Sequence, residues 1–239
     1  MVTIKNGIAT LSNSTYIFKP IDEIDGFYIF EKDGKVHKVE KRICRDIIKP
    51  NILKNEHEIP ELQEKIIYPY SNDTTPLSLM KEEFFASEFP LAYKYLELYK
   101  EGLSKRDKGR GDYGAWFAYG RTQALTDKGL KLLFPYISKH PHFVFTDNVE
   151  MLIYCGYAVF SDSADELLVL KRILESSVFD YYMQNTSKPY ASGYYSYAKN
   201  YVKYFGVCDL SHDEKEELLS LMSKKEINKF VEEKYKISI

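Results

Sequence analysis

The 239-residue chain lacks several features that mark specialised classes of protein. Its three cysteines, Cys44, Cys155 and Cys208, are too far apart for a disulfide framework or a CxxC metal pair, so we expect a reducing, cytoplasmic environment. No apolar run approaches the ~20 residues of a membrane span, and no basic and then apolar segment follows Met1, so we expect neither membrane insertion nor export. The net charge of −2 excludes a uniformly basic nucleic-acid-binding surface but allows a local one.

Motifs for catalysis and cofactor binding are also missing. There is no GxxxxGK(S/T) phosphate loop and no GxSxG nucleophile motif. Residues 109–114 match GxGxxG, but a charged segment precedes them where a dinucleotide site needs a strand, so we interpret them as a flexible loop. His140 and His142 have no nearby third ligand and fit a turn before a strand better than a metal site. Asp165 and Glu166 fit the first turn of a helix better than an acid–base pair. We therefore predict no catalytic residue and no bound metal.

The aromatic composition is unusual. The chain has 21 tyrosines beside 14 phenylalanines and a single tryptophan. Tyrosine combines an apolar ring with a polar tip and is enriched on contact surfaces, although a tyrosine-rich core would give the same composition. Residues 183–208 contain six of the tyrosines and three lysines but no Asp or Glu. Residues 104–121 contain five basic and two acidic residues, together with the tryptophan. These two segments are the candidate binding patches, because basic groups neutralise phosphates and aromatic rings contact bases and sugars.

Hydrophobic periodicity and turn residues predict a mixed α+β fold. Residues 1–70 are rich in strand signals, and residues 28–31 and 36–39 flank Asp33 and Gly34 as a β-hairpin. Residues 43–48 suggest a short helix. Further strands are expected at residues 66–70, 130–137, 142–146 and 154–160, and a loop at residues 104–114.

Helix signals dominate the remaining segments. Residues 79–86 form a short helical run, and Ser87 is expected to cap a second helix that has Pro90 in its first turn. That helix has Leu91, Tyr95, Leu98 and Gly102 at helical spacing. Three capping boxes follow, at Ser163 with Glu166, Ser211 with Glu214, and Ser223 with Glu226. The first opens one helix with the face Leu167, Leu170, Leu174, Val178 and Tyr181. We expect one domain over residues 1–210, β-rich at 1–70 and mixed at 79–210, and a helical hairpin at 211–239.

The ordered motifs of the chain resemble a known family. The similar segments are GIATLSNSTYIF (residues 7–18), IIYPY (66–70), FPLAYKYLELYKEGLSKR (89–106), WFAYGRTQAL (116–125), KLLFPYIS (131–138), LKRILESSVFDYYMQNTS (170–187) and GYYSYAKNYVKYF (193–205). In this order and spacing the chain resembles, over residues 7–210, the TaqI-like C-terminal specificity domain of adenine-specific DNA methyltransferases in type II and type IIG restriction–modification systems.

The resemblance implies a target-recognition domain that reads double-stranded DNA for adenine N6 methylation, with or without a linked endonuclease. In that family a separate N-terminal catalytic domain binds S-adenosylmethionine through an F-x-G-x-G loop and holds the flipped adenine with an NPPY-type motif. This chain has neither motif, and its nine prolines include no Pro-Pro pair. The resemblance thus implies no cofactor on this chain, a methyltransferase catalytic domain or subunit as partner, and no methylation by the chain alone.

The resemblance also implies which residues contact DNA. In the first patch these are Lys105, Arg106, Lys108, Arg110, Arg121 and Gln123, and in the second Lys188, Tyr190, Ser192, Tyr194, Tyr195 and Lys199. The first four residues of the first patch would contact phosphates or bases, and the second patch would form another strip of contacts. Arg121 and Gln123 suit bidentate base readout. Arg121 could instead be a buried partner of the WFAY motif.

Two other classes of function are compatible with the composition. A carbohydrate-active or other small-ligand enzyme with a tyrosine-lined cleft would need two carboxylates that converge in the cleft. A protein–protein adaptor would instead present an uncharged patch of tyrosines without flanking Lys and Arg.

Overall fold

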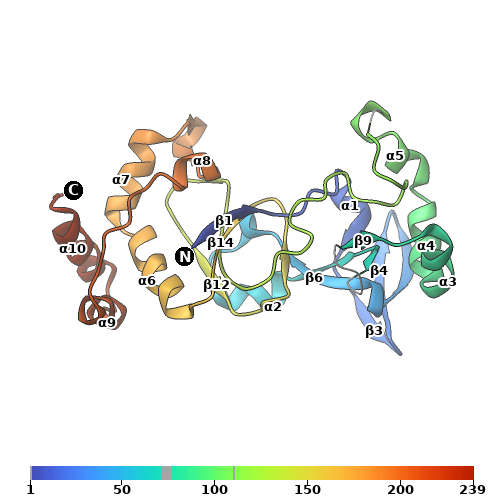
Figure 1. Ribbon diagram of the computed structural model, residues 1–239, viewed down its shortest axis with the longest axis horizontal. Helices are drawn as coiled ribbons and strands as arrows, with labels where there is room; N and C mark the ends of the chain where they lie inside the picture. Colours follow the sequence, from blue (N-terminus) through green and yellow to red (C-terminus); the bar gives the residue numbers. More distant parts are fainter. Residues whose placement is uncertain (1, 72–76, 110) are drawn as a thin grey trace. The chain divides into compact units, whose positions relative to one another are not determined.

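The computed structural model describes residues 2–71, 77–109 and 111–239, and the chain divides into two compact units. Unit 1 consists of Met1–Gly7, Lys49–Glu61 and Lys128–Ile239, and unit 2 of Ile8–Ile48 and Leu62–Asp127. The predicted α+β class is confirmed, with strands prevailing in the N-terminal part and helices at the C-terminal end (Figure 1). The division differs from the expected one, because each unit is assembled from separate stretches of the chain.

Unit 2 contains two antiparallel sheets and a small strand pair. The first sheet has the order β3 (Asp22–Ile24), β4 (Phe27–Lys32), β5 (Lys35–Glu40). The second includes β6 (Cys44–Ile48), β7 (Glu64–Ile67) and β2 (Ile17–Phe18), in that order, and the pair is β8 (Tyr70–Ser71) with β9 (Ser78–Leu79). The predicted Asp-Gly hairpin is confirmed between β4 and β5. Asp33 and Gly34 have φ values of 52° and 71°, the left-handed conformation that a two-residue hairpin turn requires.

The helix expected at residues 43–48 is wrong. A short 3-10 turn, η1 (Lys41–Ile43), leads into strand β6, which pairs with β7 in the register Arg45↔Ile66. Ile47 and Ile48 are both buried, so both faces of this strand are covered at its end, because successive side chains of a strand point to opposite faces. Pairing with a strand 20 residues further along the chain therefore decides the conformation of this segment.

The helices of unit 2 are α1 (Asn13–Tyr16), α3 (Glu82–Glu88), α4 (Pro90–Glu97) and α5 (Lys100–Ser104). Pro90 occupies the first turn of α4 as predicted, but Ser87 lies inside α3 and does not cap α4. The buried carboxylate of Glu40, at the end of β5, instead accepts hydrogen bonds from the backbone N–H groups of Leu91 (2.8 Å) and Ala92 (2.9 Å). A charged acceptor from a distant strand thus satisfies the free amides of the helix start.

The hydrophobic face of α4 also differs from the expected one. Ala92, Tyr95 and Leu96 are buried, whereas Leu98 is 66% exposed. Tyr95 was predicted correctly, and its hydroxyl donates to the carbonyl oxygen of Thr15 at 2.9 Å.

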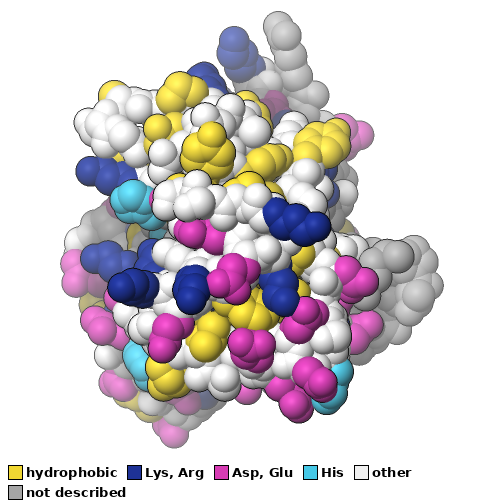
Figure 2. Space-filling view, turned by 90° about the vertical axis from the view of Figure 1, so that its left-hand side faces the viewer, with side chains coloured by type: hydrophobic (Ala, Val, Ile, Leu, Met, Phe, Trp, Pro, Cys, Tyr) yellow, Lys and Arg dark blue, Asp and Glu magenta, His cyan; other side chains and the backbone are white. Residues whose placement is uncertain are grey.

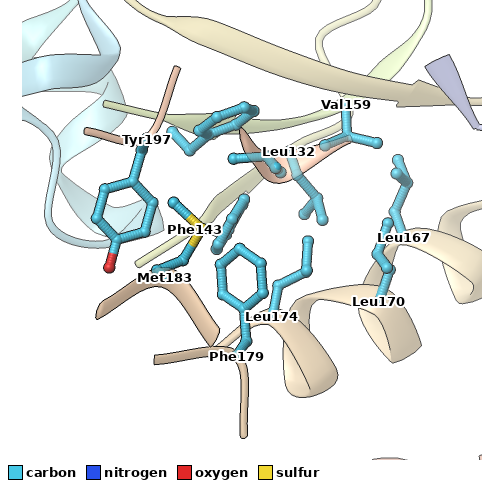
Figure 3. Close-up of a cluster of buried hydrophobic side chains, with 11 residues drawn as sticks. Leu132, Phe143, Val159, Leu167, Leu170, Leu174, Phe179, Met183 and Tyr197 are labelled. Carbon is cyan, nitrogen blue, oxygen red and sulfur yellow. The ribbon is translucent and has the colours of Figure 1, made fainter. Parts of the chain in front are cut away.

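Unit 1 is built on a four-stranded antiparallel sheet with helices packed against it. The strand order is β1 (Thr3–Asn6), β14 (Tyr157–Ser161), β10 (Leu130–Phe134), β12 (Val144–Thr146). Helix α6 (Ala164–Leu174) packs against it, and α7 (Ser177–Thr186) contributes side chains to the same hydrophobic cluster. In Figure 3, leucines of α6 meet Leu132 and Val159 of the sheet, and Phe179 and Met183 of α7 complete the cluster.

The single helix expected after Ser163 is two helices. It breaks at Glu175 and Ser176, so that Val178 is buried while Tyr181 is 54% exposed. Ser163 caps α6 by accepting from the N–H of Glu166, but the Glu166 carboxylate accepts from the Ser161 hydroxyl and does not complete a capping box.

A helical hairpin ends the chain, as predicted. Helices α9 (His212–Ser220) and α10 (Lys224–Tyr235) both begin with the predicted complete capping boxes. Their apolar residues, which include Leu218, Ile227 and Phe230, form a second cluster with Val169 and Ile173 of α6. The hairpin therefore belongs to unit 1 and is not a domain of its own.

The remaining elements of the described residues are short. They are η2 (Pro50–Ile52), η3 (Glu56–Glu58), α2 (Ile59–Leu62), η4 (Arg106–Gly109), β11 (Ile137–Ser138), β13 (Leu152–Ile153), β15 (Pro189–Tyr190), η5 (Ala191–Gly193), β16 (Tyr194–Ser196) and α8 (Lys199–Val202). Within the part of the chain that the structure describes, every helix is too short or too polar to cross a bilayer.

Candidate nucleic-acid interface

The first candidate patch follows α5 in unit 2 and is anchored by Arg106. This side chain is 7% exposed, and its guanidinium donates four hydrogen bonds to backbone carbonyls. The acceptors are the oxygens of Leu103 (2.7 Å), Thr10 (2.7 Å), Ala118 (2.8 Å) and Trp116 (3.2 Å). The expectation that Arg106 faces solvent and contacts DNA is therefore wrong. Arg106 holds the loop to the body of unit 2, because its planar fork of donors matches several carbonyls at once.

The aromatic residues of the WFAYG segment are also structural. Tyr119 is buried, and its hydroxyl donates to the carbonyl oxygen of Ile67 at 2.5 Å. Its N–H donates to the hydroxyl of Tyr70 at 2.8 Å, and its ring lies edge-on to that of Tyr16 at 5.0 Å. Burial raises the pKa of Tyr70 to about 12, so this cluster stays neutral at physiological pH. The alternative of a tyrosine-rich core is confirmed for these residues.

Arg121, unlike Arg106, is exposed. Its Nη1 donates to the Asp107 carboxylate at 2.9 Å and to the Gly120 carbonyl oxygen at 2.7 Å, while half of the side chain (51%) remains exposed. The Arg121 guanidinium holds the pKa of Asp107 below its usual range, and the Tyr113 hydroxyl donates to the same carboxylate at 2.9 Å. The alternative of a buried Arg121 is wrong. Its guanidinium lies at the surface and binds the Asp107 carboxylate. A DNA phosphate could bind the guanidinium in the same way, because it is also an anion with oxygen acceptors.

The backbone beside this ion pair is unusual. Asp107, Lys108 and Gly109 have successive φ values of 51°, 60° and 73°, all in the left-handed region. Two non-glycine residues in a row in this conformation are strained, and they turn the Lys108 side chain to the solvent.

The other predicted residues of this patch are exposed where the structure describes them. Lys105 is 72% exposed and pairs with Glu101 one helical turn earlier, and Gln123 also lies at the surface. Arg110 lies outside the described residues.

A hollow of about 530 Å³ lies next to Arg121 in unit 2. Tyr70, Tyr113 and Tyr119 are among its lining residues, so it fits the tyrosine-lined cleft of the alternative enzyme function. Its described lining includes one carboxylate, that of Asp112, whereas glycoside hydrolysis needs two that face each other. The hollow therefore does not supply the acid–base pair that this alternative requires.

The second candidate patch lies in unit 1 on a three-stranded antiparallel sheet with the order β11, β16, β15. Lys188 lies over the ring of Tyr190 at 5.2 Å, and Tyr190 and Tyr194 are 42% and 39% exposed. Ser192 is exposed at the turn between β15 and β16 with φ of 61°, and Lys199 is exposed at the start of α8. These predicted residues thus lie close together on the surface along one short stretch of chain.

Two tyrosines of the same segment have other positions. Tyr195 is half-buried and packs against the main hydrophobic cluster of unit 1, and Tyr197 is fully buried within it. Lys139, which sequence analysis missed, lies over the exposed Tyr194 ring with its Nζ 5.2 Å from the ring centre. No pattern in the sequence pointed to Lys139, because only the pairing of β11 with β16 brings it beside Tyr194. The exposed tyrosines are flanked by lysines, so the patch is not the uncharged surface that an adaptor function would predict.

The two histidines considered as metal ligands have different partners. His140 Nδ1 lies 3.0 Å from Asp180 Oδ2, and His142 Nε2 lies 2.9 Å from the Leu53 carbonyl oxygen. Nowhere in residues 2–71, 77–109 and 111–239 do three or more His, Cys, Asp or Glu side chains gather as metal ligands.

The helical hairpin has a different surface from these patches. Figure 2 shows one side of the molecule, on which Lys and Arg side chains alternate with Asp and Glu over the lower part, and hydrophobic groups gather above them. Ion pairs such as Lys234 with Glu214 (2.5 Å) and Lys229 with Glu233 (3.9 Å) neutralise charge locally on α9 and α10. The hairpin therefore offers exposed lysines that serve as controls for the two patches.

Comparisons with known proteins agree with each other. No protein-family model matches the chain. The type II restriction enzyme and methyltransferase RM.Eco57I of Escherichia coli is 28% identical to it over 132 residues, which are 51% of this chain and 13% of that protein. The Type IIL restriction–modification enzyme MmeI, solved in complex with DNA, has a similar fold, with a TM-score of 0.67 at 10% identity over 100% of this chain and 33% of that one. The chain thus spans a third or less of the length of either protein.

Proposed function

We propose that this chain is the DNA-recognition part of a restriction–modification enzyme that methylates adenine at N6. The proposal rests on one observation above all: a sequence match and an independent fold match both lead to restriction–modification enzymes. The MmeI structure contains DNA, and its similarity covers the whole of this chain. The two surface patches with exposed lysines, Arg121 and tyrosines supply groups suited to a duplex.

The proposed division of labour follows from what the chain contains. It has no NPPY-type motif and no F-x-G-x-G loop, so a methyltransferase catalytic domain or subunit would supply S-adenosylmethionine binding and the flipped-adenine pocket. The present chain would set where on the duplex that domain acts. The catalytic domain and this chain would together form a TaqI-like methyltransferase.

Arg121 is the proposed base or phosphate reader of unit 2. Its guanidinium is already positioned by Asp107 and the Gly120 carbonyl, and a DNA phosphate or a guanine edge would replace the Asp107 carboxylate. The exposed Lys105 and Lys108 would contribute phosphate contacts from the same loop. Arg106 would act only by holding this loop in place.

Salt-dependent duplex binding tests the proposal. Because each phosphate contact contributes about 0.9 to the slope of log K against log salt, Lys105→Gln with Lys108→Gln should lower the slope by about 2. The matched control is Lys225→Gln with Lys229→Gln, which also removes two exposed charges, one of them from an ion pair between residues i and i+4.

Fluorescence anisotropy with labelled duplexes, selected from a random library with the full enzyme, measures these slopes. Equal slopes for the test and control variants would show that the loop does not contact DNA. A chain that binds no duplex at any salt concentration, alone or within the enzyme, would refute the function.

A further inference from the structure

A second hollow, of about 390 Å³, lies in unit 1 beside the exposed ring of Tyr194. Three segments that are far apart in the sequence form it: residues 51–54, residues 137–142 and Tyr194 of β16. The side chains that matter for its chemistry are those of Asn51, Lys54, Ser138, Lys139, His142 and Tyr194. Its volume lies in the range of sites that hold small ligands or parts of larger ones.

The charge of the hollow is positive. Lys54 and Lys139 are both exposed, and neither forms an ion pair with another residue of the described chain. The described lining contains no Asp or Glu. Two carboxylates outside the lining contact residues that belong to it. Asp180 pairs with His140, and Glu58 accepts from the backbone N–H of Lys54 at 2.7 Å. The ammonium groups of Lys54 and Lys139 are therefore available to an external anion.

An aromatic surface lies next to these cations. The β11–β16 register, Ser138↔Tyr195, brings Lys139 beside Tyr194, and its Nζ lies 5.2 Å from the ring centre. The ring is 39% exposed, so a sugar or a base can contact it while an adjacent phosphate binds the lysine.

Hydrogen bonds hold the walls in this arrangement. The Asn51 side-chain oxygen accepts from the Tyr136 N–H at 3.0 Å, and a His142 ring nitrogen lies 2.9 Å from the Leu53 carbonyl oxygen. The Ser138 hydroxyl donates to the His140 carbonyl oxygen at 2.7 Å. Residues 51–54 and 136–142 are thus tied together by direct contacts, which positions the hollow before any ligand binds.

We infer that this hollow binds a backbone phosphate of duplex DNA between Lys54 and Lys139, with the neighbouring sugar against Tyr194. The inference rests on the proposed function and extends the second patch to residues of the 51–54 and 137–142 segments. The phosphate is sequence-independent, so this contact fixes position on the duplex and carries no base readout.

Lysine protection in the native full enzyme tests the inference without any substitution. We would label lysines with an acylating reagent, with and without a random-sequence duplex of about 30 base pairs at low salt, where nonspecific binding is strong. DNA should slow the labelling of Lys54 and Lys139 about fivefold or more, as expected for ammonium groups engaged with phosphate. Labelling of Lys225 and Lys229 on α10 should not change, and equal protection of all four lysines would overturn the assignment.

A charge-removal pair gives an independent test. Lys54→Gln with Lys139→Gln should lower the salt slope of duplex binding by about 2, whereas Lys225→Gln with Lys229→Gln should not. Unchanged slope in the first pair, with duplex binding retained by the native chain, would refute this inference and leave the proposed function intact. If the native chain itself does not bind duplex DNA, the proposed function is refuted and the inference with it. Saturable binding of inorganic phosphate that duplex cannot displace would show that the hollow takes a free anion, which also overturns it.

Discussion

Replacing Arg106 with alanine should destabilise unit 2 strongly without removing a DNA contact. The guanidinium donates to the carbonyl oxygens of Leu103, Thr10, Trp116 and Ala118, and the side chain is 7% exposed. A charged hydrogen bond contributes about 1.5–3 kcal/mol to stability, and a buried carbonyl left without its donor costs about 1–3 kcal/mol.

Not all four acceptors are lost equally. The Thr10 oxygen also accepts from the Gly120 N–H at 3.0 Å, and the Ala118 oxygen from the Tyr16 hydroxyl at 3.2 Å, so both keep a donor in the variant. The loss therefore comes mainly from the other two bonds, and we expect the free energy of unfolding to fall by about 3 kcal/mol.

Urea unfolding followed by tryptophan fluorescence measures this change. Trp116 is the only tryptophan, and its own carbonyl accepts from Arg106, so its emission reports on the segment that Arg106 holds. The control is Lys105→Ala at the neighbouring position, where the side chain is 72% exposed and the expected change is about 0.5 kcal/mol or less. The slope of log K against log salt for duplex binding should show the reverse pattern. Lys105→Ala should lower this slope, whereas folded Arg106→Ala should leave it unchanged. A loss below about 1 kcal/mol for Arg106→Ala would refute the structural role derived from these contacts.

Three further outcomes are expected. Asp107→Asn should tighten duplex binding about threefold in anisotropy measurements, because it frees the Arg121 guanidinium from an exposed carboxylate; weaker binding would contradict this competition. Lys131→Met should lower the free energy of unfolding by about 3 kcal/mol in chemical denaturation, because the fully buried ammonium donates to three carbonyls within residues 148–151; an unchanged midpoint would contradict it. The hydrogen bond from Lys234, with those from Ser211, lowers the pKa of Glu214 from 4.5 to about 2. The Glu214 carboxylate therefore stabilises the fold above pH 4.5, and this contribution is lost as the pH falls toward 2. In acid titrations followed by circular dichroism, Glu214→Gln should lose less stability over this pH range than the native chain.

Local signals in the sequence predicted the elements that need no distant partner. Asp33 and Gly34 specify the hairpin turn, because both positions need positive φ. Ser211 and Ser223 specify the starts of α9 and α10, because each serine satisfies amides within its own first turn. Where a distant group supplies the bond, local signals failed. The start of α4 is satisfied by Glu40 and not by Ser87, and residues 43–48 become a strand because β7 pairs with them.

The same distinction between local and distant contacts applies to the residues of the candidate site. The basic loop was visible in the composition, as was the tyrosine-rich segment without Asp or Glu. Burial was not visible, so the sequence predicted a DNA contact for Arg106 and allowed a buried position for Arg121, whereas Arg106 is the arginine that bonds to four carbonyls and Arg121 lies at the surface. Lys54 and Lys139 had no signal at all, because only the folded chain places residues 51–54, 137–142 and 194 around one hollow. The sequence by itself determined the α+β class, the β4–β5 turn and the starts of α9 and α10, since these turns and starts depend on neighbours along the chain. Tertiary structure decided which cations face solvent and which tyrosines form the core, since burial depends on contacts between segments far apart in the sequence.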